Sequence, residues 1–213
     1  MRNMTDTEDV EAQLLPRSGP LLIVLSGPSG VGKDAVVARM KELKLPIHFV
    51  VTATTRPRRP GETDGEDYYF LTHERFQEML SQDEFLEWAH VYCNFYGVPK
   101  NQVRDALGKG MDVLIKLDIQ GAETIKRLQP NALFIFLAPS CMKDVEDRLK
   151  QRGTESAEEF ALRLETARSE MKQLPNFDYV VINHHDGVDQ AVAEIQAIIT
   201  AEKRRVVPRR VEL

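Results

Sequence analysis

A glycine-rich segment near the amino end of the chain has the composition of a phosphate-binding loop. It reads Gly27-Pro28-Ser29-Gly30-Val31-Gly32-Lys33. Glycines let the backbone curl so that several N–H groups face one anion, and the lysine after the last glycine reaches the outer phosphates of a nucleotide. The alternative is an ordinary glycine turn. An apolar strand pattern before the segment and a helix pattern after it favour phosphate binding instead.

The residue that follows this lysine departs from the usual pattern. A serine or threonine is expected there, because its hydroxyl binds the Mg²⁺ that accompanies the nucleotide. This chain has Asp34. A carboxylate is also a hard oxygen ligand for magnesium, so we predict that Asp34 helps to hold Mg²⁺. The same carboxylate would bring negative charge close to the phosphates.

A second group of residues has the chemistry to bind a phosphate. Arg56 and Arg59 lie in the polar segment 54–62, where prolines and glycine forbid regular structure. Their guanidinium groups can fork onto phosphate oxygens, and the hydroxyls of Tyr68 and Tyr96 can donate neutral hydrogen bonds. The alternative is that these are exposed loop arginines and core tyrosines.

The elements that must position these residues alternate between strand and helix. An unbroken apolar run at 21–25 is typical of a strand covered on both faces, and a helix pattern follows at 35–43. Further strands are predicted at 47–53, 113–117, 133–137 and 179–182. The predicted helices are one that ends near 110, one over 121–128, one through 145–149, one that begins with a Ser156–Glu159 capping box, and one that begins at 188. This alternation predicts a three-layer α/β fold around a parallel sheet.

One stretch interrupts the alternation. The β-prone runs 68–71 and 85–90 flank a short helix for which Thr72 is the expected cap. We therefore expect a small inserted subdomain, placed at about 52–98.

Composition limits the class of protein. The 213 residues carry a formal net charge of −5, which disfavours a general binder of nucleic acid or of membrane surfaces. Cys93 and Cys141 lack the spacing of a disulfide framework or zinc site, so a reducing cytoplasm is predicted. Residues 1–19 contain no continuous apolar stretch and are expected to form a flexible extension, and 204–213 a loose basic tail.

Several motifs occur in an order that resembles guanylate kinases. After the glycine loop come Thr54-Thr55-Arg56-Pro57-Arg58-Arg59-Pro60-Gly61-Glu62, Asp64-Gly65-Glu66-Asp67-Tyr68, Glu84-Phe85-Leu86-Glu87-Trp88-Ala89, Tyr96-Gly97 and Asp118-Ile119-Gln120-Gly121. The resemblance covers about residues 20–203. It implies a phosphate-loop fold that transfers the terminal phosphoryl group of ATP to GMP with Mg²⁺, a GMP-binding subdomain, and a helical lid at about 140–170.

The resemblance also implies roles around the guanine base. Glu87 stands where the family has the carboxylate that accepts both the N1–H and N2–H donors of guanine, although a lone glutamate is more often solvated. Thr52 and Asp118 match further residues of the GMP site. The hydroxyl often found after the Tyr-Gly pair is replaced by Val98, which removes one expected base contact.

On the ATP side, the resemblance places Arg148, Arg152 and Arg163 on the lid, where arginines meet the migrating phosphoryl group. The alternative is solvated helix surface, because Asp144 with Arg148 and Glu159 with Arg163 have the four-residue spacing of helix ion pairs. Asn183 resembles the edge of the donor-base pocket.

A second departure affects the strand before Asp118, where the family usually has two acids separated by one residue. Here the first of them is Lys116. We take Asp34 and Lys116 as linked changes, in which the acid has moved onto the loop to meet the metal or to pair with the lysine.

The sequence is also compatible with two other functions. Some guanylate-kinase-like domains are non-catalytic binding modules, which the altered metal region favours and the intact loop with Lys33 disfavours. A related kinase acting on a sugar phosphate is the third reading. Glu87 and the paired tyrosines favour a guanine nucleotide over it.

Overall fold

The structure is a computed structural model that describes residues 19–91, 93–152 and 157–213. Its core is a sheet of five parallel strands in the order β2-β7-β1-β8-β9. The strands are β1 (Leu22–Ser26), β2 (Ile47–Phe49), β7 (Asp112–Lys116), β8 (Leu133–Pro139) and β9 (Tyr179–Asn183). The predicted α/β fold with a parallel sheet is confirmed.

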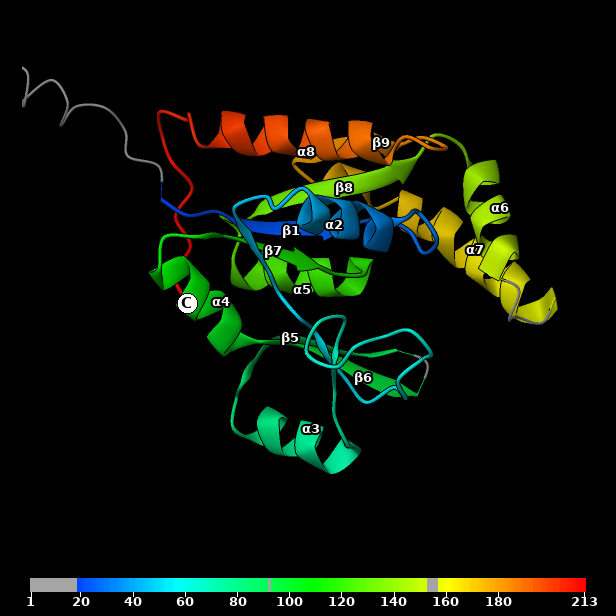
Figure 1. The fold of residues 1–213 in the computed structure, drawn as a ribbon, viewed down its shortest axis with the longest axis horizontal. Helices are drawn as coiled ribbons and strands as arrows, with labels where there is room; N and C mark the ends of the chain where they lie inside the picture. Colours follow the sequence, from blue (N-terminus) through cyan, green and yellow to red (C-terminus); the bar gives the residue numbers. More distant parts are fainter. Residues whose placement is uncertain (1–18, 92, 153–156) are drawn as a thin grey trace, which may run out of the picture.

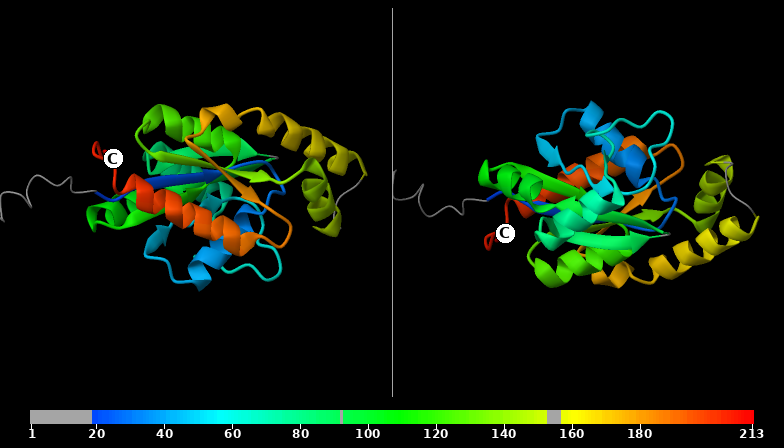
Figure 2. Two further views of the ribbon diagram at one scale, coloured as in Figure 1. Left: turned by 90° about the horizontal axis from the view of Figure 1, so that it is seen from above. Right: turned by 90° about the horizontal axis from the view of Figure 1, so that it is seen from below.

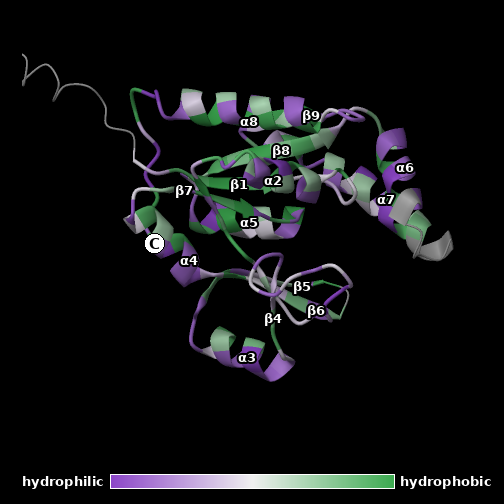
Figure 3. Cartoon of the chain, in the orientation of Figure 1, coloured by the Kyte–Doolittle hydropathy of each residue, from purple (hydrophilic) through white to green (hydrophobic). Residues whose placement is uncertain are grey.

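Helices cover both faces of this sheet and give three layers (Figures 1 and 2). On one face, α2 (Lys33–Glu42) and α8 (Val188–Glu202) enclose an apolar cluster with β1 and β8. On the other face, α4 (Lys100–Gly108) and α5 (Ile119–Leu128) enclose a second cluster. Figure 3 shows the apolar strands between helices whose outer surfaces are polar. Burial on both faces explains why the core strands are unbroken apolar runs.

A smaller sheet in the order β4-β3-β6-β5 lies beside the core (Figure 1). Its strands are β3 (Ala53–Thr54), β4 (Tyr69–Phe70), β5 (Phe85–Val91) and β6 (Asn94–Pro99), and it packs against α3 (His73–Ser81). Phe76 of α3 stacks on Phe85 with ring centroids 4.4 Å apart. Thr72 caps α3 as predicted, because its hydroxyl accepts a hydrogen bond from the Arg75 N–H.

The stretch 47–53 is not the single strand that its composition predicts. β2 ends at Phe49 and β3 begins at Ala53, in a different sheet. Between them, the side-chain amide of Gln102 bonds both the N–H and the C=O of Val51, at 3.0 and 2.8 Å. A side chain thus replaces the neighbouring strand, and the chain can leave the core sheet without losing these hydrogen bonds.

Strand β6 was not predicted, because Asn94, Gly97 and Pro99 are turn formers in isolation. Gly97 is needed for packing in this strand. A Cβ atom there would lie 2.6 Å from the ring of Phe85 on the adjacent strand β5. Tertiary contact therefore overrides local propensity.

Two helices, α6 (Met142–Arg152) and α7 (Ala157–Met171), extend beyond the carboxyl ends of the core strands (Figure 1). They are followed by a short 3-10 turn, η1 (Leu174–Asn176). The predicted cap Ser156 lies outside the described residues, as do residues 1–18.

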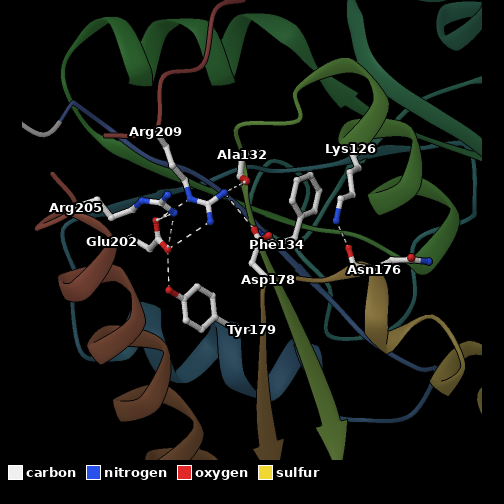
Figure 4. Close-up of polar contacts among 9 residues, drawn as sticks. All are labelled: Lys126, Ala132, Phe134, Asn176, Asp178, Tyr179, Glu202, Arg205 and Arg209. Atoms are coloured by element: carbon white, nitrogen blue, oxygen red, sulfur yellow. Dashed lines mark hydrogen bonds and ion pairs between the residues drawn. The ribbon is translucent and has the colours of Figure 1, made fainter. Parts of the chain in front are cut away.

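The prediction of a loose basic tail at 204–213 is wrong. Arg209 forms ion pairs with Glu202 and Asp178, at 2.7 and 3.2 Å, and donates to the carbonyl of Ala132 at 2.8 Å (Figure 4). Val211 packs against the apolar cluster under α4 and α5. The composition of the segment did not predict this order, because two partners of Arg209, Asp178 and Ala132, lie far away in the sequence.

Candidate active site

The glycine loop joins the carboxyl end of β1 to the start of α2. Gly27 has a φ of 149°, and a Cβ atom there would lie 2.1 Å from the carbonyl oxygen of Leu137 on β8. Gly32 has a φ of 99° and precedes the helix directly. Only glycine fits these positions, and the loop is thereby held at a helix N-terminus, where backbone N–H groups attract anions.

Lys33, the first residue of α2, folds back over the loop. Its ammonium donates to the carbonyls of Gly27 and Pro28, at 2.5 and 3.2 Å. Burial lowers the pKa of Lys33, against the opposing effect of the nearby Glu170, Asp34 and Asp118 carboxylates. Carbonyl oxygens are weak partners for an ammonium compared with phosphate oxygens, so a nucleotide can take this lysine from them.

Both helices beyond the core contact the loop. Arg148 of α6 donates to the carbonyl of Val31 at 2.6 Å and to those of Asn183 and His184 at 3.3 and 3.2 Å. Arg163 of α7 donates to the Ser29 hydroxyl at 3.1 Å. The structure thus brings these two predicted arginines to the loop.

The surface-pair alternative for Arg148 is not what the structure shows. Asp144 accepts instead from the hydroxyl of Ser140, and Arg148 points to the loop. Arg152 is the last residue of α6, and its side chain lies outside the described residues, as does Glu159.

Asn183, at the end of β9, lies beneath the loop. Its side chain is buried, and its amide nitrogen donates to the carbonyl of Val31 at 2.8 Å. The same nitrogen would lie 2.6 Å from a Cβ atom on Gly32. Asn183 therefore holds the backbone of the loop in place through its hydrogen bond to Val31.

Sequence reasoning missed Glu170 on α7. Its carboxylate accepts a hydrogen bond from the Ser29 N–H at 2.8 Å. Burial raises the pKa of Glu170, while this hydrogen bond and Lys33 oppose the rise. Glu170 follows Arg163 by two helical turns, so both reach Ser29 from one face of α7. This two-turn spacing from Arg163 is the feature of the sequence that could have pointed to Glu170.

The arginine loop and the tyrosines border a hollow between the core and the small sheet. We call it the outer hollow; it has a volume of about 740 Å³ and is lined by residues that include Arg56, Arg59, Tyr68, Tyr96 and Lys116. A smaller inner hollow adjoins it, with walls that include Lys33, Thr52, Glu87 and Asp118. Asp34, Thr52, Tyr68, Tyr96 and Lys116 line both.

Glu62 organises the arginine loop and was also missed. Its carboxylate pairs with the Arg56 guanidinium at 2.7 Å and accepts from the Arg59 N–H at 2.7 Å. Arg56 also lies over the ring of Tyr68, 5.4 Å from its centroid. These contacts hold the Arg56 guanidinium at the edge of the outer hollow.

Glu87 is a buried carboxyl in the wall of the inner hollow. It is 4% exposed, and burial, with a smaller contribution from Asp118, raises its pKa to about 8. Asp118 caps α5 by accepting from the Gly121 N–H at 2.8 Å. Val98 packs in the core under α4 and α5 and does not line either hollow. A buried carboxyl facing a cavity can recognise a pair of hydrogen-bond donors.

Comparison with known proteins shows the family of this chain. The guanylate kinase family model matches residues 20–202. The chain belongs to the guanylate kinase family.

Relatives within this family match nearly the whole chain. Guanylate kinase 2, chloroplastic/mitochondrial, of Oryza sativa subsp. japonica is 47% identical over 94% of this chain and 70% of its own length. The guanylate kinase of Caldanaerobacter subterraneus subsp. tengcongensis is 46% identical over 87% and 89%. The crystal structure of guanylate kinase from Anaplasma phagocytophilum superposes with a TM-score of 0.74 at 32% identity, covering 89% of each chain.

The two departures from the guanylate kinase pattern meet in space. The Lys116 ammonium forms an ion pair with the Asp34 carboxylate, as one branch of the linked-change hypothesis expects. Residues 19–91, 93–152 and 157–213 contain no group of three or more His, Cys, Asp or Glu arranged to hold a metal. Mg²⁺ is usually bound by one or two carboxylates together with substrate phosphates, so the exposed Asp34 fits a magnesium ligand.

Proposed function

We propose that this protein binds ATP on the glycine loop and GMP in the two hollows, and transfers the terminal phosphoryl group to give ADP and GDP. The observation that carries this proposal is the wall of the inner hollow. Lys33 of the ATP loop and Glu87 of the small sheet line the same cavity. Two nucleotides can therefore meet there end to end, as direct transfer between them requires.

GMP recognition divides between the hollows. Arg56, Arg59, Tyr68 and Tyr96 bind its phosphate in the outer hollow, and the carboxylate of Glu87 accepts from N1–H and N2–H of the base. Thr52 and Asp118 complete the base site. The small sheet and α3, at about 52–98, form the GMP-binding unit.

ATP recognition uses the backbone of 27–33, the ammonium of Lys33 and the loop support from Asn183. Arg148, Arg152 and Arg163 belong to the lid, at about 140–170. They gather on the transferred group as charge develops on its oxygens. A phosphate oxygen of GMP attacks the terminal phosphorus and the bond to the ADP oxygen breaks. Lid closure excludes water, which would otherwise compete as acceptor.

Asp34, as the residue after Lys33, is the proposed protein ligand of Mg²⁺. When bound, the ion neutralises charge on the outer phosphates of ATP.

A substrate panel tests the proposal. The protein is incubated with ATP, Mg²⁺ and in turn GMP, AMP, CMP, UMP or a pentose phosphate, while ADP release is followed. We expect strong preference for GMP. ADP release with the pentose phosphate alone would support the sugar phosphate kinase, and GMP binding without turnover would support a non-catalytic module.

Replacing Glu87 by Gln sharpens the test, because it swaps one acceptor oxygen for a donor facing guanine N–H groups. GMP turnover should fall while ATP binding is kept. Glu84→Gln, at a half-buried position just before β5, is the matched control. Equal loss of GMP turnover and ATP binding in Glu87→Gln would contradict the assigned role.

The remaining expectations concern the cellular compartment and the binding partners of this protein. Within the described ranges, every helix is too short or too polar to cross a bilayer. We propose the cytoplasm as the compartment, from the cysteine pattern, and small nucleotides rather than nucleic acid or membrane as partners. Fractionation of the source cells checks the first.

A further inference from the structure

We propose that Lys116 is an additional phosphate-binding residue, whose ammonium exchanges Asp34 for the phosphate group of bound GMP. This inference rests on the proposed function, because it requires GMP in the hollows. It assigns a role to a lysine at a position where the family usually has an acid.

The place of Lys116 in the fold supports this role. It is the last residue of β7 and lies beside Leu25 at the end of β1, just before the glycine loop. Its side chain lines both hollows, together with Tyr68. Lys116 therefore stands between the wall with Lys33 and the wall with Arg56, where the GMP phosphate must lie during transfer.

The contacts of Lys116 place its ammonium beside the proposed phosphate site. The ammonium forms an ion pair with the Asp34 carboxylate. The ammonium also lies over the Tyr68 ring, 5.4 Å from the centroid. A cation is thus held against one of the tyrosines proposed to bind the same phosphate.

The present partner of Lys116 is easy to replace. The Asp34 side chain is 69% exposed, against 24% for Lys116, so the carboxylate can regain water if the pair separates. Solvent around the carboxylate weakens its attraction for the ammonium. A phosphate monoester carries a charge of about −1.5 to −2 at neutral pH and offers three acceptor oxygens. The exchange therefore favours the phosphate.

Asp34 opposes GMP binding in this arrangement. It competes for the ammonium and places a negative charge beside the outer hollow. Removing the carboxylate should tighten GMP binding, whereas removing the ammonium should weaken it. Opposite signs for two members of one ion pair are not expected if the pair only stabilises the fold.

The experiment compares GMP with guanosine, which lacks the phosphate, by calorimetric titration without ATP or metal. In Lys116→Met, GMP should bind about tenfold more weakly and guanosine unchanged. In Asp34→Asn, GMP should bind several-fold more tightly. The double variant should resemble Lys116→Met. Lys44→Met, an exposed charge-matched control after α2, should match the wild type.

Other results overturn the inference. Equal weakening of GMP and guanosine in Lys116→Met would assign the lysine a purely structural role, and wild-type GMP affinity in that variant would remove it from the phosphate site. Asp34→Asn gives an independent reading if Lys116→Met does not fold. If the wild type turns over GMP but Lys116→Met binds it normally, this inference alone fails. If the wild type does not distinguish GMP from guanosine, the proposed phosphate site fails too.

Discussion

The two ends of the parallel sheet use charged side chains differently. At the amino ends of the strands, Asp112 and Glu202 are buried and pair with basic residues of the carboxyl-terminal segment. At the carboxyl ends, Lys33 is held by loop carbonyls and Lys116 by the exposed Asp34. In the contacts at the amino ends, charged side chains of the protein neutralise one another. In the contacts at the carboxyl ends, the lysines are held by groups that phosphate oxygens can replace.

The amino-end contacts form a closed network. Glu202 accepts from the Tyr179 hydroxyl at 2.7 Å and pairs with Arg209, which also pairs with Asp178 (Figure 4). Asp178 in turn accepts from the Phe134 N–H at 2.9 Å. The network ties the last segment to the starts of β8 and β9. We infer that one end of the sheet contributes stability and the other end contributes binding.

The largest effect should come from breaking the amino-end network. Arg209→Met leaves the carboxylate of Glu202, whose side chain is 2% exposed, without its closest cation. Removal of one partner from a buried pair typically costs about 3–5 kcal/mol of unfolding free energy. Urea denaturation measures this loss, and kcat per folded molecule should be unchanged. Arg210→Met, an exposed neighbour, should unfold like the wild type. Equal stability of the two variants would contradict the comparison.

The complementary change at the other end is Lys33→Met. It removes the cation expected on the transferred phosphoryl group, and loss of one such electrostatic contact typically lowers kcat by about 10²–10³-fold. The unfolding free energy should change little, because the lysine's partners are loop carbonyls. Steady-state kinetics and denaturation are compared with Lys109→Met, an exposed control after α4. A variant that loses stability but keeps kcat would reverse the assignment of the two ends.

Sequence reasoning reached the carboxyl end more readily than the amino end. The glycine loop, Lys33 and the arginine segment are local patterns, since neighbouring residues create both the backbone shape and the charge. The role of Arg209 depends on Glu202 and Asp178, which come from other elements. For this reason a basic tail was predicted to be loose.

The same distinction explains the missed elements. Strand β6 owes its state to the packing of Gly97 on Phe85, and Glu170 reaches Ser29 across 141 positions of sequence. Neither partner is visible in a single sequence window. Strands and helices, in contrast, differ in the spacing of their apolar residues, which a single sequence shows. Their alternation along the chain predicts the layers and the parallel sheet.

A third effect is the pH dependence of GMP binding at the carboxyl ends of the core strands. Burial raises the pKa of Glu87 to about 8, so this carboxyl holds a proton below that pH. Guanine N–H donors favour the carboxylate, and GMP binding must then release the proton. Affinity for GMP should therefore rise with pH, by at most about tenfold per unit, and level off above pH 8. Titration in buffers of different ionisation enthalpy counts the protons released.

Glu87→Gln provides the control for this dependence. The amide does not titrate, so GMP affinity should be weak and nearly constant between pH 6 and 8, within about twofold per unit. The variant should fold at least as stably as the wild type at pH 8, since a buried carboxyl no longer has to ionise. A wild-type affinity that falls as the pH rises toward 8 would contradict the assignment of Glu87 as acceptor.

The smallest effect should separate the charge of Glu170 from its hydrogen bond to Ser29. Glu170→Gln keeps an acceptor oxygen for the Ser29 N–H but removes a negative charge near Lys33, so ATP should bind about threefold more tightly. Glu170→Ala removes the acceptor as well and leaves α7 to hold Ser29 through Arg163, so ATP should bind more weakly than in the Gln variant. Glu165→Gln, exposed on the same helix, is the matched control. Equal ATP affinity in Gln and Ala variants would mean that the hydrogen bond to Ser29 does not position the loop. The loop would then be held by the hydrogen bonds of Arg148, Arg163 and Asn183, and Glu170 would act on it only by charge.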